Sequence, residues 1–386
     1  MPWNESTRMD ERRLFVEAYR SGRFTMAELC RSAGVSRPTG YLWVERYRGH
    51  GEAGLWDRSH AVRSCPHRTP TGVVDRLLEL RRDHPFWGPR KLRAVAYRRW
   101  PGVAWPSRST LAEILKREGL SAARRPRRRQ SERAGTTART PAHPNALWTF
   151  DFKGQFLTGD HRYCYPLTTT DLASRQLLQC VALPDTRSAA VERRSDALMR
   201  ELGLPDVIHS DGGAPFASVG LGRLSRLSLH WLRLGIRLER SRPASPQDNA
   251  SHERMHRTLK QETTRPPEHN LTAQQRRFDR FRKQFNHERP HEALADRTPA
   301  EFYRPSLRPS PRRLEEVCYP GHFERRQINQ VGQMRWKAQR LFVGGVFAGE
   351  TVGLEEIEDG VWSLYFASHL LARWDEQVGK LIEVPV

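Results

Sequence analysis

The spacing of apolar residues near the start of the chain predicts helices rather than strands. In residues 9–50 apolar side chains recur every three or four positions, which is the period of one helix face. The pattern breaks at Gly22 and Gly34, and Ser36 is suited to cap a third helix. Three short helices with tight turns between them predict a helix-turn-helix unit over residues 1–60.

Helical spacing returns after this unit. Residues 70–120 predict three more helices, the last of which can be capped by Ser107 or Ser109. We therefore predict a second helix-turn-helix unit, of winged-helix type, over residues 66–120. The following residues 121–144 lack apolar periodicity and contain the cluster RRPRRR, which predicts a basic linker.

Strand patterns dominate the rest of the chain. Residues 145–305 begin with three predicted strands, in ALWTFDFKGQFL, HRYCYPLTTTDL and RQLLQCVAL, and then alternate between helices and strands. This order predicts a layered core of α/β or α+β type with a mixed sheet. Residues 325–386 are rich in strand patterns and predict a small C-terminal β-barrel.

The charge balance indicates the kind of partner. The 386 residues include 65 Lys and Arg against 44 Asp and Glu, a formal net charge of +21. Such a surplus favours a polyanion, of which nucleic acid is the commonest. The sequence has no apolar run able to span a bilayer and no secretory signal, so we expect a cytoplasmic, nucleoid-associated protein without a membrane partner. Five scattered cysteines argue against a disulfide framework or a cysteine-bound zinc.

Two stretches are candidates for contact with double-stranded DNA. Arg37, Thr39 and Tyr41 fall early on the third predicted helix, where base edges are usually met, although a plain three-helix packing unit has the same pattern. The linker arginines can follow a phosphate backbone or enter a minor groove, and the simpler alternative is a solvated tether. They are Arg124, Arg125, Arg127, Arg128 and Arg129.

Three carboxylates in the predicted α/β core stand out by their context. Asp151 lies between Phe150 and Phe152 in an apolar strand, where an unpaired carboxylate is costly. Asp211 ends the predicted strand VIHSD at a Gly-Gly turn, and Glu253 lies one turn into a predicted helix. Each aspartate alone could be an ordinary strand-end residue. Together the three are candidates for a site with two Mg²⁺ or Mn²⁺ ions, which can activate an attacking oxygen and stabilise a leaving one.

The helix that carries Glu253 also carries groups suited to holding DNA near such a site. His256 and Lys260 follow Glu253 by three and seven residues, which places them near one face of the helix. The expected DNA contacts in this region are Asn249, His256, Arg257 and Lys260.

The same segment supports a different hypothesis. Residues 252–256 read H-E-x-x-H, the spacing by which a helix offers two imidazoles to zinc and a glutamate as general base in metalloproteases. A second copy at 287–291 contains Pro290, which would disrupt the helix that the motif requires. The extended metzincin pattern fails because Leu259 and Glu262 occupy its next positions. A protease also gives no reason for two helix-turn-helix units, so this zinc metalloprotease remains an alternative only.

Several motifs make the sequence resemble a known family. They are WTFDFKG, DLASR, HSDGGAPF, SRPASPQDNASHERMHRTLK and FNHERPHEALADRTPAEFY, and the double helix-turn-helix precedes them. In these motifs the chain resembles the bacterial insertion-sequence transposases, whose catalytic core is of the retroviral-integrase, RNase H-like type.

This resemblance implies the roles of particular residues. Asp151, Asp211 and Glu253 correspond to the catalytic Asp-Asp-Glu (DDE) triad, whereas Asp171 corresponds to a recurring position to which we assign no chemistry. The implied enzyme is a transposase that binds the terminal inverted repeats of its element. It cuts a DNA strand with Mg²⁺ and transfers the freed 3′-OH to target DNA, with two or more subunits pairing the ends. An inactive, transposase-derived DNA-binding regulator is the alternative.

The chain departs from many members of the family at three places. It has Asp211-Gly212-Gly213 where relatives read Asp-Asn-Gly, and Asn249-Ala250 where they read Asn-Gly. The gap between Asp211 and Glu253 is also longer than in many relatives, with the extra length in ASVGLGRLSRLSLHW. None of these differences removes a carboxylate, but the last one makes the local helix packing uncertain to predict.

Overall fold

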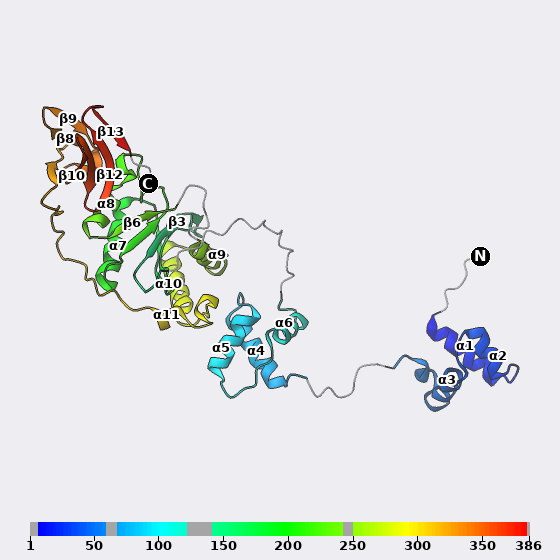
Figure 1. The fold of residues 1–386 in the computed structure, drawn as a ribbon. Coiled ribbons are helices and arrows are strands. Elements are labelled where there is room, and N and C mark those ends of the chain that lie inside the picture. Colours follow the sequence, from blue (N-terminus) through cyan, green and yellow to red (C-terminus); the bar gives the residue numbers. More distant parts are fainter. Residues whose placement is uncertain (1–6, 59–67, 122–140, 242–249, 384–386) are drawn as a thin grey trace. The chain divides into compact units, whose positions relative to one another are not determined.

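The computed structural model divides into two compact units, Met1–Arg68 and Thr69–Val386 (Figure 1). The residues that it describes are 7–58, 68–121, 141–241 and 250–383. The finer division into five segments remains a prediction, and the linker arginines and Asn249 lie outside the described residues. Among the described residues, no helix combines the length and apolar character that a membrane span requires.

The first unit contains the three helices that the sequence predicts. Their bounds are α1 Arg8–Arg20, α2 Met26–Ala33 and α3 Arg37–His50, followed by the short 3₁₀ helix η1 Gly51–Leu55. Thr25 forms a capping box at α2, and the Ser36 side chain accepts a hydrogen bond from the Thr39 N–H at the start of α3. Gly34 ends α2 with a φ of 66°, a left-handed conformation that glycine adopts without strain.

The core of this unit is small and closely packed. It consists of Phe15, Val16, Met26, Cys30, Val44 and Leu55. Gly54 lies so close to α3 that a Cβ atom there would be 2.2 Å from the Arg46 carbonyl oxygen. The turn after α3 therefore needs a glycine at this position.

Three further helices open the second unit: α4 Thr71–Asp83, α5 Pro89–Arg99 and α6 Arg108–Arg117. They pack around a common core that includes Leu77, Trp87 and Leu92. Ser107, one of the two predicted caps, accepts a hydrogen bond from the Thr110 N–H. Residues 68–121 are all described and contain no strand, so the predicted winged form is wrong and the segment is purely helical.

A mixed sheet forms the centre of the second unit. Its strands are β1 Trp148–Phe152, β2 Phe156–Leu157, β3 Tyr163–Asp171, β4 Leu177–Leu183, β5 Val207–Ser210 and β6 Arg237–Arg240. β3 pairs antiparallel with β1, β2 and β4, whereas β1, β5 and β6 run parallel to one another. The predicted mixed sheet is confirmed, and β1 lies at its centre beside β5.

Helices pack on the sheet through two separate hydrophobic clusters (Figure 1). Helices α7 Ser188–Leu202 and α8 Arg226–Arg233 belong to the cluster around Phe150 and Trp231. Helices α9 Ala250–Thr263 and α10 Leu271–His287 belong to the cluster that contains Met255 and Phe278. Short helices η2 Leu221–Arg223, η4 Glu292–Leu294 and α11 Pro299–Phe302 complete this part of the chain.

The C-terminal strands form an open sheet. In spatial order the strands are β13 Lys380–Glu383, β12 His369–Asp375, β11 Val361–Phe366, β10 Thr351–Glu358 and β7 Glu324–Gln327. Strands β8 Gln333–Trp336 and β9 Gln339–Phe342 form a separate hairpin, and η5 Gly345–Phe347 follows. No strand pairing among the described residues closes this sheet, so the predicted β-barrel is corrected to an antiparallel sheet with a hairpin. Local strand patterns predict strands but not the pairing between the first and the last of them.

Helix α8 joins the central sheet to the C-terminal sheet. Leu227 and Trp231 face the cluster beneath the central sheet, while Leu229 and Leu232 belong to the cluster that includes Trp374 of the C-terminal sheet. The helix is therefore apolar on two sides. The extra stretch ASVGLGRLSRLSLHW contains most of these residues, so its length provides the surface on which the C-terminal sheet packs.

Candidate active site

Asp151 stands on strand β1, and Asp211 directly follows the neighbouring parallel strand β5. Asp151 lies in β1 and its side chain is 20% exposed. The β1–β5 register pairs Phe150 with Ser210, so the residues that follow, Asp151 and Asp211, lie side by side where the pairing ends. Asp211 is exposed, and the Gly213 N–H donates a hydrogen bond to its carboxylate at 3.3 Å. The Gly-Gly turn thus leaves this carboxylate free to face a ligand.

The third carboxylate, Glu253, belongs to helix α9 and not to a strand of the sheet. It lies near the start of α9 and is exposed, whereas His252, Met255 and His256 of the same helix are buried. Its charge is one of those that raise the pKa of Asp151. Because the charges of Asp211 and Glu253 both act on Asp151, the structure brings together the three carboxylates that the sequence singles out.

The pKa of Asp151 reflects the charges of the other two carboxylates. Burial, together with the negative charges of Asp211 and Glu253, raises the pKa of the Asp151 carboxyl from 3.8 to about 7. The Phe152 N–H and the Lys153 ammonium act in the opposite direction. Like charges gathered around a buried carboxyl favour either a proton or a cation at this point, so the carboxylate oxygens are suited to a divalent metal ion.

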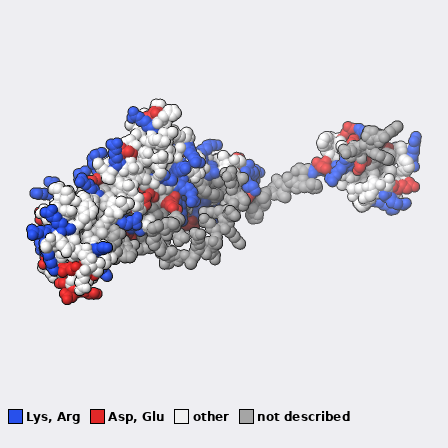
Figure 2. Space-filling model, turned by 90° about the horizontal axis from the view of Figure 1, so that it is seen from above, with Lys and Arg blue, Asp and Glu red and all other residues white. Residues whose placement is uncertain are grey.

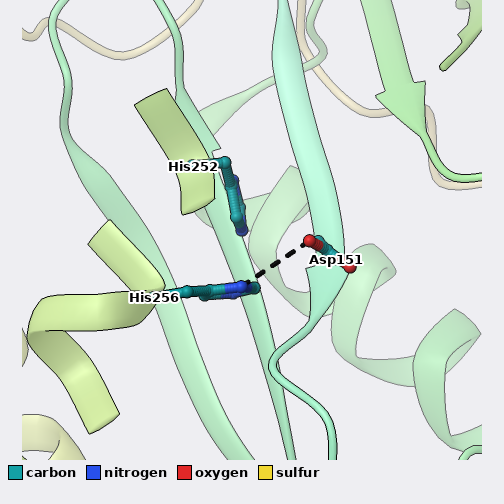
Figure 3. Close-up of side chains that lie close together, drawn as sticks. All are labelled: Asp151, His252 and His256. Carbon is teal, nitrogen blue, oxygen red and sulfur yellow. Dashed lines mark ion pairs between the residues drawn. The ribbon is translucent and has the colours of Figure 1, made fainter. Parts of the chain in front are cut away.

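Two histidines lie against Asp151 from the buried side of α9 (Figure 3). His256 Nδ1 is 3.6 Å from Asp151 Oδ2. Desolvation lowers the pKa of His252 to about 3 and that of His256 to about 2, so both imidazoles are neutral at pH 7 and the contact is not an ion pair there. One ring nitrogen of each histidine and one Asp151 carboxylate oxygen lie within 4.8 Å of one another, which makes the trio geometrically able to approach a metal ion.

A second group with this property joins two helices elsewhere in the unit. Glu192 and Asp196 of α7 and His230 of α8 offer ligand atoms within 4.8 Å of one another. His230 Nε2 is 2.7 Å from Asp196 Oδ1. This pair is accounted for by the packing of α7 against α8.

The second H-E-x-x-H copy does not form a helical site. Helix α10 ends at His287, and His291 lies beyond it in a β-bridge with Arg297. Burial lowers the pKa of His291 to about 3, and its ring packs edge-on against Phe285. Pro290 thus marks the end of the helix, as the sequence predicts, and the two histidines do not share one helix face.

The predicted DNA contacts have different surroundings. Arg37 and Tyr41 are exposed in the first turns of α3, and Thr39 is partly buried. Arg257 and Lys260 are exposed on α9. The sequence also predicts a DNA contact at His256, but this side chain is only 5% exposed and faces Thr168 and Asp151, so we do not retain it as a contact. Asn249, Arg124, Arg125, Arg127, Arg128 and Arg129 lie outside the described residues.

Sequence reasoning did not single out three residues near Asp151. Lys153 follows it in the chain and affects its pKa. Thr168 and Thr170 of β3 bind the two histidines. The TTTD run in a predicted strand was the available signal, because alternate residues of a strand share one face of the sheet. Asp171 ends this run and is fully buried, where it accepts hydrogen bonds from Asn145 and Ser174 and has a structural role.

Known families match most of the chain. Two families described as Integrase core domain match residues 141–246 and 234–299. The families described as Helix-turn-helix domain and Homeodomain-like domain match residues 11–61 and 39–115. The family described as IS481 family transposase, C-terminal domain matches residues 324–380.

Individual relatives are more distant. The chain is 25% identical over 232 residues to the insertion element IS407 uncharacterized 31.7 kDa protein of Burkholderia multivorans, a match that covers 60% of this chain and 80% of that protein. Similar solved structures include a chain of the simian T-cell lymphotropic virus intasome in complex with PP2A regulatory subunit B56 gamma, which is 17% identical with a TM-score of 0.38 and covers 76% of this chain and 97% of that chain.

Another is the HTLV-2 integrase catalytic core domain in complex with magnesium, which is 13% identical with a TM-score of 0.33 and covers 42% of this chain and 99% of that chain. The catalytic core domain of BIV integrase is 19% identical with a TM-score of 0.32, covering 41% of this chain and 93% of that chain. The family matches run in the order helix-turn-helix, integrase core and transposase C-terminal domain. The chain is therefore an insertion-sequence transposase with helix-turn-helix domains ahead of an integrase core domain, and its C-terminal segment matches the IS481 family transposases.

Proposed function

We propose that this transposase binds the terminal inverted repeats of its element and catalyses metal-dependent strand cleavage followed by strand transfer. Asp151, Asp211 and Glu253 are the catalytic triad in this proposal. The observation that carries it is the state of Asp151, whose pKa is raised to about 7 by burial and by the charges of the other two carboxylates. Such an accumulation of negative charge in a partly buried place is typical of a catalytic or cation-binding site.

The donor set fits Mg²⁺ or Mn²⁺. All three proposed ligands supply hard carboxylate oxygens, which these ions prefer. Two ions per site, when bound, activate the attacking oxygen and neutralise charge on the leaving one. The chain supplies the fixed part of the site, because Asp151 stands on a central strand, Asp211 directly after its neighbour β5 and Glu253 on a helix packed against the sheet.

The proposed reaction has two phosphoryl-transfer steps. Water first hydrolyses a phosphodiester at the element end and leaves a free 3′-OH. That hydroxyl then attacks a phosphodiester of target DNA in line, so the broken bond is replaced by a new one without a covalent enzyme intermediate. The central sheet, with β4-β3-β1 antiparallel and β1-β5-β6 parallel, is compatible with an RNase H-like core for this chemistry.

Exposed cations near the carboxylates are suited to hold the DNA. Glu253, Arg257 and Lys260 follow one another at helical intervals of four and three residues, and all three are exposed. On the face seen in Figure 2, basic side chains are spread widely and interleaved with fewer acidic ones. We infer that α9 presents a carboxylate and two phosphate-binding cations to the same DNA segment.

Recognition of the element ends is assigned to the helix-turn-helix units. Arg37 and Tyr41 stand exposed at the start of α3, the third helix of the first unit, which is the position that meets base edges in this type of domain. The cognate partner is double-stranded DNA of the element ends and the target, bound by a dimer or higher oligomer of the transposase.

The experiment is strand cleavage of a labelled duplex that carries the element's own terminus, with Mg²⁺. Asp151→Asn, Asp211→Asn and Glu253→Gln should each abolish cleavage while DNA affinity stays within about threefold of wild type, since neutralising a carboxylate does not weaken phosphate binding. Glu201→Gln, on exposed Glu201 of α7, is the matched control and should cleave normally. Strong cleavage by any one of the three triad variants would show that the triad is assigned incorrectly.

The regulator hypothesis gives a different result in the same experiment. A protein that binds the DNA terminus of its element tightly and specifically, yet cuts no strand with Mg²⁺ or Mn²⁺, would be a regulator that acts only by occupying that DNA. Peptide cleavage that depends on Zn²⁺ would instead support the metalloprotease alternative suggested by residues 252–256.

A further inference from the structure

The two histidines of the 252–256 motif have no part in the proposed phosphoryl transfer, although their placement is specific. His252 is 1% exposed and His256 is 5% exposed. A buried imidazole loses its hydration, so its two nitrogens need partners inside the protein. The partners of these nitrogens therefore indicate what the histidines do.

Both rings share one partner, Thr168. Its hydroxyl oxygen is 2.7 Å from His252 Nε2 and 2.7 Å from His256 Nε2, and it donates to the Asp151 carbonyl oxygen at 3.1 Å. A hydroxyl has one proton and two lone pairs. Because the proton is used at the carbonyl, each imidazole must donate from Nε2 to one of the lone pairs. The Thr168 hydroxyl is then fully used.

This assignment also fixes the other ring nitrogens. His252 Nδ1 accepts a hydrogen bond from the Thr170 hydroxyl at 2.9 Å. His256 Nδ1 points toward Asp151 Oδ2, and the two rings meet edge to face with centroids 4.5 Å apart (Figure 3). Both nitrogens of His252 and Nε2 of His256 are therefore engaged with hydroxyl groups of β3. A zinc ion bound by the two histidines would have to break these hydrogen bonds.

The network connects the elements that carry two of the proposed catalytic carboxylates. Thr168 is the cross-strand partner of Asp151 in the β1–β3 register. His252 and His256 are four residues apart, so they lie one above the other on the same face of α9. Glu253 stands on the turn between them. Two attachments one turn apart fix both the height and the rotation of α9 on the sheet, and so the location of Glu253 relative to Asp151.

We propose that His252 and His256 are positioning residues, which hold Glu253 in place beside Asp151 through the Thr168 hydroxyl and so prepare the carboxylates for a divalent cation. The inference rests on the proposed function, which makes these carboxylates cation ligands. It assigns the H-E-x-x-H spacing to helix placement instead of zinc binding.

The test is Mn²⁺ binding to the full-length protein, measured as free Mn²⁺ by electron paramagnetic resonance. Thr168→Val keeps the shape of the side chain and removes the hydroxyl. It should raise the Mn²⁺ dissociation constant about 10- to 100-fold, the usual effect of losing a residue that orients metal ligands. Thr168→Ser restores the hydroxyl and should restore most of the affinity.

A neighbouring residue provides the matched control. Thr169 lies on the same strand, is also fully buried, and its hydroxyl accepts a hydrogen bond from Gln179 at 2.8 Å. Thr169→Val makes the same chemical change on the opposite face of the sheet. It should leave the Mn²⁺ dissociation constant within about twofold of wild type, even if it lowers thermal stability as much as Thr168→Val.

A pair of His256 variants tests the same idea without changing β3. The amide of His256→Gln extends about as far as Nε2 and can still donate to Thr168, whereas the amide of His256→Asn is too short. We expect His256→Gln to keep Mn²⁺ affinity within about threefold of wild type and His256→Asn to lose about tenfold or more. The same order should appear in the Mn²⁺ concentration needed for half-maximal strand cleavage.

Two results would overturn the inference. One is an equal loss of Mn²⁺ affinity in Thr168→Val and Thr169→Val, because affinity would then follow general stability. The other is tight Zn²⁺ binding that survives Asp151→Asn and disappears in His252→Ala, because the histidines would then be ligands. Failure of the proposed function gives a separate result, since Asp151→Asn would then bind Mn²⁺ as well as wild type does.

Discussion

Asp151 stands between two phenylalanines on a central strand, where a carboxylate loses most of its hydration. Its apolar neighbours in the sequence, taken together with Asp211 and Glu253, predict a functional carboxylate at this position. The sequence did not predict its contact with His256, because the two residues are far apart in the chain and meet only when α9 packs on the sheet. The sequence did not predict a role for Thr168 either, because Thr168 lies beside Asp151 only through the β1–β3 register.

The raised pKa of Asp151 predicts a particular dependence of stability on pH. The folded-state pKa of about 7 lies above the unfolded value of 3.8, so between these values the folded protein binds more protons and loses stability as pH rises. In EDTA, Asp151→Asn should therefore increase the free energy of unfolding by roughly 2–4 kcal/mol at pH 8 and by little at pH 4.5.

Thermal unfolding at the two pH values measures this difference, with Asp359→Asn, at an exposed position in the turn between β10 and β11, as control. A variant that gains equally at both pH values, or loses stability at pH 8, would mean that Asp151 is not held in an unfavourable charged state.

Most individual elements follow from local sequence patterns, whereas their long-range pairing does not. The helices of both N-terminal segments and the caps at Ser36 and Ser107 form where apolar spacing and capping residues predict them. The winged form was wrong because residues 68–121 form no strand, and the closed barrel was wrong because closure depends on pairing between the first and the last strand. The packing of α8 was also unpredictable, since its two apolar sides serve two different clusters.

The two-sided packing of α8 can be tested with Leu229. This side chain is 4% exposed and belongs to the cluster of the C-terminal sheet. Leu229→Ala should cost about 2–4 kcal/mol of stability, the usual range for a buried leucine. Arg226→Ala, at an exposed position of the same helix, is the control and should have little effect.

Limited proteolysis should locate the change produced by Leu229→Ala. If α8 anchors the C-terminal sheet, the variant should be cleaved faster between residues 305 and 386 than wild type, with the central sheet protected for longer. Uniform cleavage along the chain would argue that Leu229 stabilises the whole unit and has no special relation to that sheet.

At the scale of the whole molecule, the proposed DNA binding and the proposed DNA chemistry belong to different segments. The helix-turn-helix families match residues before the integrase core, and the first compact unit contains the exposed start of α3. A net charge of +21 supplies sequence-independent attraction to phosphates. Sequence preference should therefore depend on a few exposed side chains, and general affinity on many.

A substitution of Arg37 can test whether sequence preference and general DNA affinity depend on different side chains. Arg37→Ala should weaken binding to the element terminus by about 1–3 kcal/mol and binding to random duplex by much less, since a base contact is lost with a single charge. Arg31→Ala, on exposed Arg31 of α2, removes the same charge and should affect both duplexes equally. Competition binding at a fixed salt concentration gives both affinities. An equal loss for the two duplexes would make Arg37 a phosphate contact.

The metal requirement of strand cleavage at the element end tests the proposed transposase activity most directly. Purified wild-type protein is incubated with a terminus labelled on each strand in turn, with Mg²⁺, Zn²⁺ or EDTA, and the products are separated on a denaturing gel. We expect a nick at the terminus with Mg²⁺, none with EDTA, and a free 3′-OH that joins to target DNA. Undiminished cleavage in EDTA, or cleavage only with Zn²⁺, would contradict the proposed activity.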